Sequence, residues 1–294
     1  MSDTHSSALH SIYHPTDFSA SSLVAFHHAL KLAIGSGCNL EILHVDERAD
    51  DIDDWSSYPR VRDTLSDWGI LGADATKADL VEMLGVDVTK TNLVSHSISK
   101  SIASHLSHNT PSISDMSVGR DYQLVVMATR GQDGAPLWLI PSVSESLSRT
   151  TRVFTLFVVG GSKTFIDSAT GTSSLSRILL PIDPEIGSST ALLGAAQLIG
   201  ALKPASAQIR TLFVGEADAA PKVEWTPPQG VSVEHVTRTG TVTDTILKEA
   251  DAFGADLIVM ATQGRNGFLD ALRGSTTDQI VRRAPCPVLA VPTP

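Results

Sequence analysis

The chain has 294 residues, of which 42% are apolar, and a formal net charge of −10 at pH 7. This length is typical of about two domains, and the apolar content is sufficient for ordinary globular cores. The acidic balance argues against binding to a nucleic-acid backbone, which requires clustered Lys and Arg, but local backbone dipoles can still hold a small anion.

The N-terminal residues 1–10 lack the basic and apolar regions of a signal peptide. No stretch reaches the roughly 18 consecutive apolar residues of a membrane span, so we expect a cytoplasmic protein with no membrane segment. The two cysteines, Cys38 and Cys286, lie far apart and outside any CxxC spacing. They form neither a disulfide framework nor a zinc pattern, and we predict two buried thiols.

The first half of the chain opens with a short apolar run, residues 11–17, that ends in Pro-x-Asp. Further strand-like apolar runs cover residues 40–45, 124–128 and 153–159. Between the first two runs, apolar residues recur at helical spacing and predict a helix with one buried face. These residues are Leu23, Phe26, Leu30 and Ile34.

The second half repeats this layout. It opens with Pro-x-Asp at the end of residues 178–183, and strand-like runs follow at 208–214, 257–260 and 287–291. The clearest match is between Leu-Val-Val-Met-Ala-Thr-Arg-Gly at 124–131 and Leu-Ile-Val-Met-Ala-Thr-Gln-Gly at 257–264. Apolar runs separated by helical segments indicate parallel sheets covered on both faces, hence an α/β fold of two tandem doubly wound, Rossmann-like units. The helix predicted here presents Leu192, Ala195, Ile199 and Leu202 on one face.

The two repeats differ in length, and most of the extra residues in the first lie at about 46–86. Residues 160–176 are rich in Gly, Ser and Thr, a composition typical of a flexible linker. We therefore predict a first domain over residues 1–160, a linker over 161–176 and a second domain over 177–294.

In a doubly wound sheet, ligands bind beyond the carboxyl ends of the strands, at the switch in strand order. In the second half, Asp183 and the segment 260–276 should meet there. Gly264 and Gly267 follow a strand, where a missing β-carbon lets the backbone approach a ligand. These glycines fit a tight turn equally well, and Asp183 also fits the N-cap of a helix.

An anion would find several donors at the end of this segment. Gly274 and Ser275 precede the helical stretch 277–283, so free N–H groups and the helix dipole face outward there. The hydroxyls of Ser275 and Thr276 are further donors, and Arg265 can form a charge-assisted bond to phosphate. A plain N-cap role for Ser275 explains the same residue without any ligand.

These residues resemble the universal stress protein family, over nearly all of the chain and as two tandem domains. Nucleotide-binding members carry Gly-x-x-Gly, a nine-residue spacer and Gly-Ser/Thr after the fourth strand. Ala261-Thr-Gln-Gly264, the nine residues 265–273 and Gly274-Ser275 match this spacing, with Ala261 in place of the first Gly. The segments 256–260 and 284–291 are also similar to the family.

The resemblance implies a stress-response regulatory protein that binds ATP, or ADP or AMP, with or without Mg, mainly in the second half. It implies two five-stranded sheets packed as a pseudo-dimer through the last strands, at 153–159 and 287–291. Whether the whole chain also forms a homodimer, and which protein is its partner, stays open. The nucleotide-binding residues that it implies are Pro181, Ile182, Asp183, Val214, Met260, Ala261, Gly264, Arg265, Gly267, Gly274, Ser275 and Thr276.

The first half departs from the pattern because Pro141-Ser142 replaces Gly-Ser. Proline has no N–H and a fixed φ, so this corner loses a donor and its freedom. We predict a degenerate site here. Its weaker candidate residues are Asp17, Val45, Met127, Gly131 and Ser142.

Other chemistries have little support in the sequence. Most histidines lie in the first half, including the pairs His27-His28 and His105-x-x-His108, but no further ligand completes a zinc site, so we predict no metal ligands. The chain has neither a Gly-x-Ser-x-Gly elbow nor a P-loop, so we predict no catalytic residue and no enzyme. Two alternatives stay open: a weak ATPase or phosphotransferase, and a scaffold that binds a partner through the acidic stretch 50–55 and no nucleotide.

Overall fold

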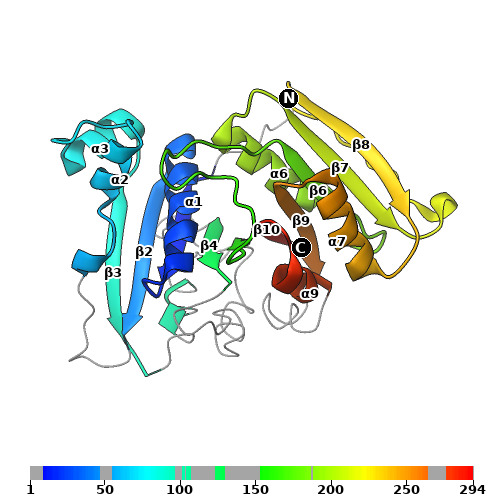
Figure 1. The fold of residues 1–294 in the computed structure, drawn as a ribbon, viewed down its shortest axis with the longest axis horizontal. Coiled ribbons are helices and arrows are strands. Elements are labelled where there is room, and N and C mark those ends of the chain that lie inside the picture. The colour runs from blue at the N-terminus through cyan, green and yellow to red at the C-terminus, as the bar shows by residue number, and fades with distance from the viewer. Residues whose placement is uncertain are drawn as a thin grey trace, which may run out of the picture.

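The computed structural model describes residues 9–46, 55–96, 101–102, 104–106, 123–129, 153–186, 188–263 and 276–293. Its described strands form one ten-stranded sheet in the order β3-β2-β1-β4-β5-β10-β9-β6-β7-β8, with the first half at the left of Figure 1 and the second at the right. The strands are β1 (Ser11–Thr16), β2 (Asn39–Asp46), β3 (Val88–Val94), β4 (Leu124–Ala128), β5 (Phe154–Val158), β6 (Arg177–Pro181), β7 (Ala207–Val214), β8 (Val231–Arg238), β9 (Leu257–Gln263) and β10 (Val288–Thr293).

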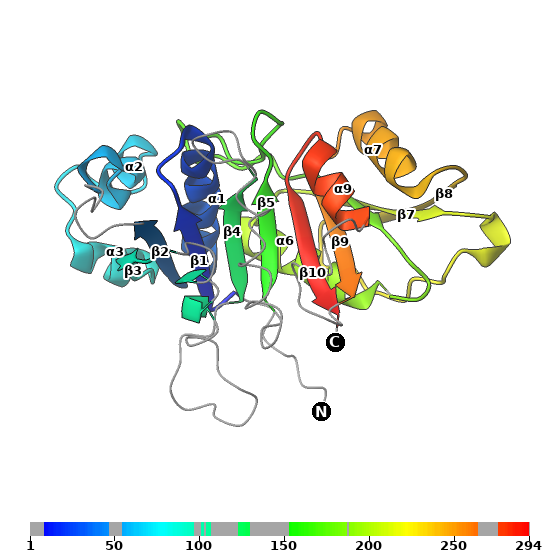
Figure 2. The same cartoon turned by 90° about the horizontal axis from the view of Figure 1, so that it is seen from below.

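The predicted α/β architecture is confirmed. Within each half the paired strands run parallel, and β1 and β4 are buried along their whole length, as apolar runs in a sheet covered on both faces should be. The two halves meet through their last strands, as the resemblance implies. β5 and β10 pair in antiparallel fashion and join them into one sheet, which Figure 2 shows from a second side. Each apolar edge strand thereby gains a partner.

A pseudo-twofold axis between β5 and β10 relates the two halves. Leu156 faces Leu289, and their neighbours pair symmetrically on either side. The rest of the register repeats in the same way: Ile12 pairs with Leu40 in the first half as Ile178 pairs with Ile209 in the second. Because the register is the same, each paired strand residue of one half has a defined counterpart in the other.

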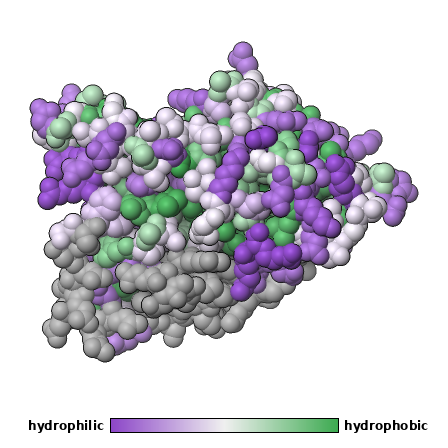
Figure 3. Space-filling view, in the orientation of Figure 1, coloured by the Kyte–Doolittle hydropathy of each residue, from purple (hydrophilic) through white to green (hydrophobic). Residues whose placement is uncertain are grey.

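Helices cover both faces of the sheet (Figures 1 and 2). On one face, α1 (Ala20–Ser36) and α6 (Ser189–Leu202) meet near the middle of the molecule and share a core that includes residues from both halves. On the other face, α7 (Val242–Phe253) and α9 (Thr276–Arg283) pack over a second core. On the face of the second half that Figure 3 shows, hydrophilic side chains are interspersed with apolar ones.

The ends of α1 follow from its sequence. Before the first turn, the Ser19 hydroxyl accepts a hydrogen bond from the Ser22 N–H at 3.1 Å, the usual role of an N-cap serine. After the last turn, Gly37 adopts φ 62°, a left-handed conformation that costs glycine little. The helix is thus fixed at both ends, with its buried face toward the sheet.

The extra residues of the first half lie between β2 and β3. They form a short 3-10 helix at Trp55–Ser57, then α2 (Val61–Asp67) and α3 (Lys77–Leu84). The corresponding connection between β7 and β8 in the second half contains the 3-10 helix Ala217–Ala219 and otherwise irregular backbone. The second half therefore lacks a counterpart to the two helices of this insertion.

The connecting segment, residues 160–176, is not the flexible linker that its composition predicts. Phe165 and Ile166 are fully buried in the core to which α1 and α6 also contribute. The indole N–H of Trp68 donates to the Ser168 carbonyl at 3.0 Å, which ties this segment to the insertion. Two large apolar side chains outweigh the small residues around them, because burying each contributes about 1.5–3 kcal/mol.

A buried carboxylate holds the end of the connecting segment. Asp256 accepts hydrogen bonds from the Ser176 N–H at 2.9 Å and the Arg177 N–H at 2.8 Å, and it also bonds the Lys163 ammonium. Burial acts to raise the pKa of Asp256, but these hydrogen bonds outweigh it and hold the pKa below its usual range. The connection is thus anchored to the second half.

The two thiols are buried and free, as predicted. Burial raises the pKa of both Cys38 and Cys286 to about 12, so neither is a reactive thiolate at neutral pH. No helix in the described part of the chain is long and apolar enough to span a bilayer.

Candidate functional site

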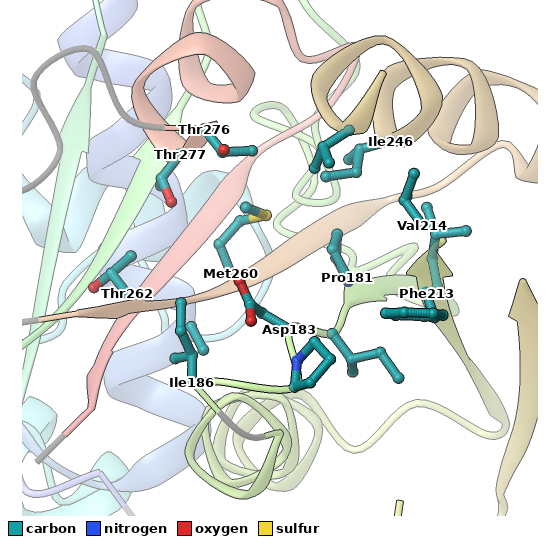
Figure 4. A pocket seen from close by; sticks show the side chains of 15 residues that line it. Pro181, Asp183, Ile186, Phe213, Val214, Ile246, Met260, Thr262, Thr276 and Thr277 are labelled. Carbon is teal, nitrogen blue, oxygen red and sulfur yellow. The ribbon is translucent and has the colours of Figure 1, made fainter. Parts of the chain in front are cut away.

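A cavity of about 330 Å³ lies in the second half, beyond the carboxyl ends of β6 and β9. These two strands are neighbours in the sheet, although the chain runs from β6 to β7 on one side and returns to β9 on the other. The cavity therefore lies at the switch in strand order, where ligands bind in doubly wound sheets. Figure 4 shows the side chains that line it.

The structure brings together all of the predicted binding residues of the second half that it describes. They come from the ends of three strands and from the start of α9. These residues are Pro181, Ile182, Asp183, Val214, Met260, Ala261 and Thr276. The predicted residues Gly264, Arg265, Gly267, Gly274 and Ser275 lie outside the described part of the chain.

One wall of the cavity was not predicted from the sequence. Val242 and Ile246, on the first turns of α7, line the cavity, and Val242 is 46% exposed. Their four-residue spacing within a helix is the signal that could have identified this wall, since residues i and i+4 share a helix face. The remaining lining residues were not predicted either; they are Pro184, Ile186, Leu212, Phe213, Thr262 and Thr277.

Asp183 is not the helix N-cap that the sequence left open as an alternative. Ser188 holds that position before α6. One Asp183 carboxylate oxygen accepts the Glu185 N–H at 2.8 Å, which closes a turn directly after β6. In Figure 4 the side chain lies near the centre of the cavity beside Met260, so an exposed carboxylate is held at an otherwise apolar floor.

Thr276 and Thr277 lie across the cavity from Asp183, at the N-terminus of α9 (Figure 4). The first N–H groups of a helix have no intrahelical acceptor, and together with the helix dipole they favour an anion. Arg282 and Arg283 in the last turn complement the other end of this helix. The site thus has two different walls. The wall at the strand ends is apolar and carries the Asp183 carboxylate, and the wall at the N-terminus of α9 is suited to a negatively charged group.

In the first half, Asp17, Val45 and Met127 occupy the places equivalent to Asp183, Val214 and Met260. Asp17 closes the same kind of turn, with its carboxylate accepting the Ser19 N–H at 3.1 Å. Val45 and Met127 are both buried. The other two candidates of the first half, Gly131 and Ser142, lie outside the described residues.

Two fully buried histidines of the first half, His14 and His28, are packed and hydrogen-bonded through Nδ1. His14 Nδ1 donates to the Val126 carbonyl at 2.8 Å, and its Nε2 lies 3.1 Å from the Tyr58 hydroxyl. His28 Nδ1 donates to the Val24 carbonyl at 2.8 Å. Burial lowers the pKa of both rings to about 4. Among the described residues, no cluster of His, Cys, Asp or Glu could hold a metal ion.

Comparison with known proteins shows similarity to one family. The model of the universal stress protein family matches residues 9–158 and 222–292. Universal stress protein Sll1654 of Synechocystis is 38% identical over 64 residues, which are 22% of this chain and 41% of that protein. Universal stress protein MJ0531 of Methanocaldococcus jannaschii is 27% identical over 153 residues, covering 42% of this chain and 86% of that protein.

Solved structures show the same fold over the whole length. A universal stress protein from Archaeoglobus fulgidus aligns with a TM-score of 0.58 and 18% identity, covering 96% of this chain and 98% of that one. The functionally unknown protein PA1789 from Pseudomonas aeruginosa aligns with a TM-score of 0.57 and 14% identity, covering 98% and 94%. At these identities the likeness concerns the fold alone.

Proposed function

This chain belongs to the universal stress protein family, and from that premise we propose that it is a stress-response regulator that binds an adenine nucleotide in its second half. ATP, ADP and AMP share the adenosine that the cavity would hold, and Mg²⁺ would accompany the phosphates of ATP. The proposal is for binding rather than turnover. Of the lining residues that the structure describes, Asp183 alone is ionisable, so these residues give it no second group for acid–base catalysis.

The observation that carries the proposal is the cavity at the switch in strand order. Its volume of about 330 Å³ falls in the range of small-molecule sites, which are mostly apolar with a few placed polar groups. Val214, Ile246 and Met260 provide apolar surface for a flat base. Asp183 would accept a hydrogen bond from the exocyclic amine of adenine, and the α9 N-terminus would face the phosphates.

A matched pair of variants tests this placement. Asp183→Ala is expected to weaken ATP binding about tenfold, because a hydrogen bond to a charged group contributes about 1.5–3 kcal/mol. Asp17→Ala removes the equivalent carboxylate, and the equivalent turn, from the first half. It is expected to leave ATP affinity unchanged. Isothermal titration calorimetry at constant Mg²⁺ gives both constants.

The pair of variants also separates the proposed site from its alternatives. Equal weakening in both variants would place the effect outside the cavity of the second half. Wild-type protein that shows no saturable heat with ATP, ADP or AMP would contradict the proposal itself and favour a partner-binding scaffold.

A further inference from the structure

A second cavity of about 380 Å³ lies in the second half, on the face of the sheet that carries α6. Thr211 and Phe213 of β7 and His235 and Thr237 of β8 form its floor. The segment 220–224, which connects these two strands, forms its wall. Ile182 and Phe213 also line the first cavity, but Thr237 and Ala220 line this one alone.

The pseudo-twofold relation identifies the counterpart of this cavity in the first half. Thr211 pairs with His235 in the register in which Ile42 pairs with Lys90. One step along the same face, Phe213 pairs with Thr237 as His44 pairs with Asn92. The Lys90 and Asn92 positions therefore correspond to those of His235 and Thr237.

In the first half this place is filled by aromatic side chains of the insertion. The Trp55 indole N–H donates to the Asn92 side-chain oxygen at 2.7 Å. The Lys90 ammonium lies 4.8 Å from the Trp55 ring centroid, in cation–π contact. The rings of Phe18 and Tyr58 meet the Trp55 ring edge-on, at centroid distances of 5.1 and 5.6 Å. The first half thus shows which group this part of the fold accommodates: an indole with its N–H bonded to β3.

The second half has the equivalent strand surface, on β7 and β8, but of the residues that the structure describes no indole lines the cavity there. Its connection from β7 to β8 has no helices equivalent to those that follow Trp55, and the place is a cavity. Thr237, at the Asn92 position, offers a hydroxyl oxygen that can accept the same hydrogen bond. Phe213 provides a ring, and Pro221 and Val223 provide apolar wall.

From this correspondence we propose that the second cavity binds a free planar aromatic molecule with a ring N–H, of the indole class. The ring would lie between Phe213 and the segment 220–224, and its N–H would donate to the Thr237 hydroxyl. The proposed hydrogen-bond acceptor, Thr237, does not line the nucleotide site. The proposal therefore does not depend on nucleotide binding.

Fluoroindole, observed by fluorine NMR on the full-length chain, tests this site. We expect saturable binding with one molecule per chain. Thr237→Val keeps the shape but removes the acceptor, and it is expected to weaken fluoroindole about fivefold, the effect of one hydrogen bond of about 1 kcal/mol. Benzothiophene, which has the same shape without the N–H, is expected to bind the wild type more weakly than indole does. Its affinity for Thr237→Val is expected to equal its affinity for the wild type.

A second variant blocks the site by volume. Ala220→Trp places an indole in the wall of the cavity, as Trp55 does in the first half, and is expected to abolish fluoroindole binding. ATP affinity is expected to stay at the wild-type value in both variants, and ATP is expected not to displace fluoroindole. The proposal is overturned if the wild type shows no saturable shift, if neither variant weakens binding, or if ATP displaces the probe.

Discussion

Acidification from pH 7 to pH 4 is expected to lower the free energy of unfolding of the wild type. In the double variant His14→Gln, His28→Gln, this decrease is expected to be smaller by about 6 kcal/mol. Both rings are fully buried, and burial lowers the pKa of each from 6.5 to about 4. Each ring is neutral in the folded protein above about pH 4, because burial disfavours the charged imidazolium, and its Nδ1 donates to a backbone carbonyl. A glutamine can keep that donor without titrating.

The sign follows from proton uptake. Between pH 6.5 and pH 4 the unfolded chain protonates these imidazoles while the folded chain does not, so acid favours unfolding. The stabilising contribution is complete above pH 6.5 and is lost as the pH falls through about 4, at about 3 kcal/mol per ring. Urea titrations followed by circular dichroism at several pH values provide the free energies. Each single variant should remove half of the difference, and parallel curves for wild type and double variant would contradict the assignment.

The contact between α1 and α6 leads to the second large effect. A β-carbon added at Gly35 would lie 2.0 Å from the Ala201 carbonyl oxygen, a backbone atom that no side-chain rotation can move away. Gly35→Ala must therefore separate two helices that share one core. Overpacking of this kind costs about 1–3 kcal/mol, and we expect the upper end of this range because the clash is with backbone.

Gly200→Ala, in α6, is the matched control. An added β-carbon at Gly200 meets nothing within 4 Å. Alanine is a better helix former than glycine, so this variant should gain about 0.5–1 kcal/mol. Thermal and urea unfolding of both variants compare the two effects directly. A Gly35→Ala protein as stable as the wild type would show that the two helices do not meet so closely.

The strand ends of the candidate site could be predicted from the sequence. Each half has Pro-x-Asp at the end of its first strand and a Met-Ala-Thr motif at the end of its fourth strand. Because parallel strands end together, these motifs place Asp183 and Met260 at the same edge of the sheet. The resemblance to the family also predicted the pairing of the last strands. The α7 wall was missed because Val242 and Ile246 lie far from any motif and only their helical spacing marks them.

Two features depend on tertiary packing, which local sequence does not encode. The connecting segment has the composition of a linker, yet the buried ring of Phe165 and the buried side chain of Ile166 fix its path. The role of Trp55 follows only once the register sets Asn92 beside it and aligns that position with Thr237. Both the connecting segment and the segment around Trp55 consist mostly of polar or small residues. Their structure depends on the few large side chains that pack in the core.

Photolabelling with azido-ATP, followed by mass spectrometry of the labelled peptides, tests the central claim most directly. The account predicts label in the peptides that contain residues 181–186, 212–214 or 242–246, and loss of that label when unmodified ATP competes. Label confined to the equivalent strand ends of the first half, around Asp17 and Val45, would contradict it, as would label that ATP fails to displace.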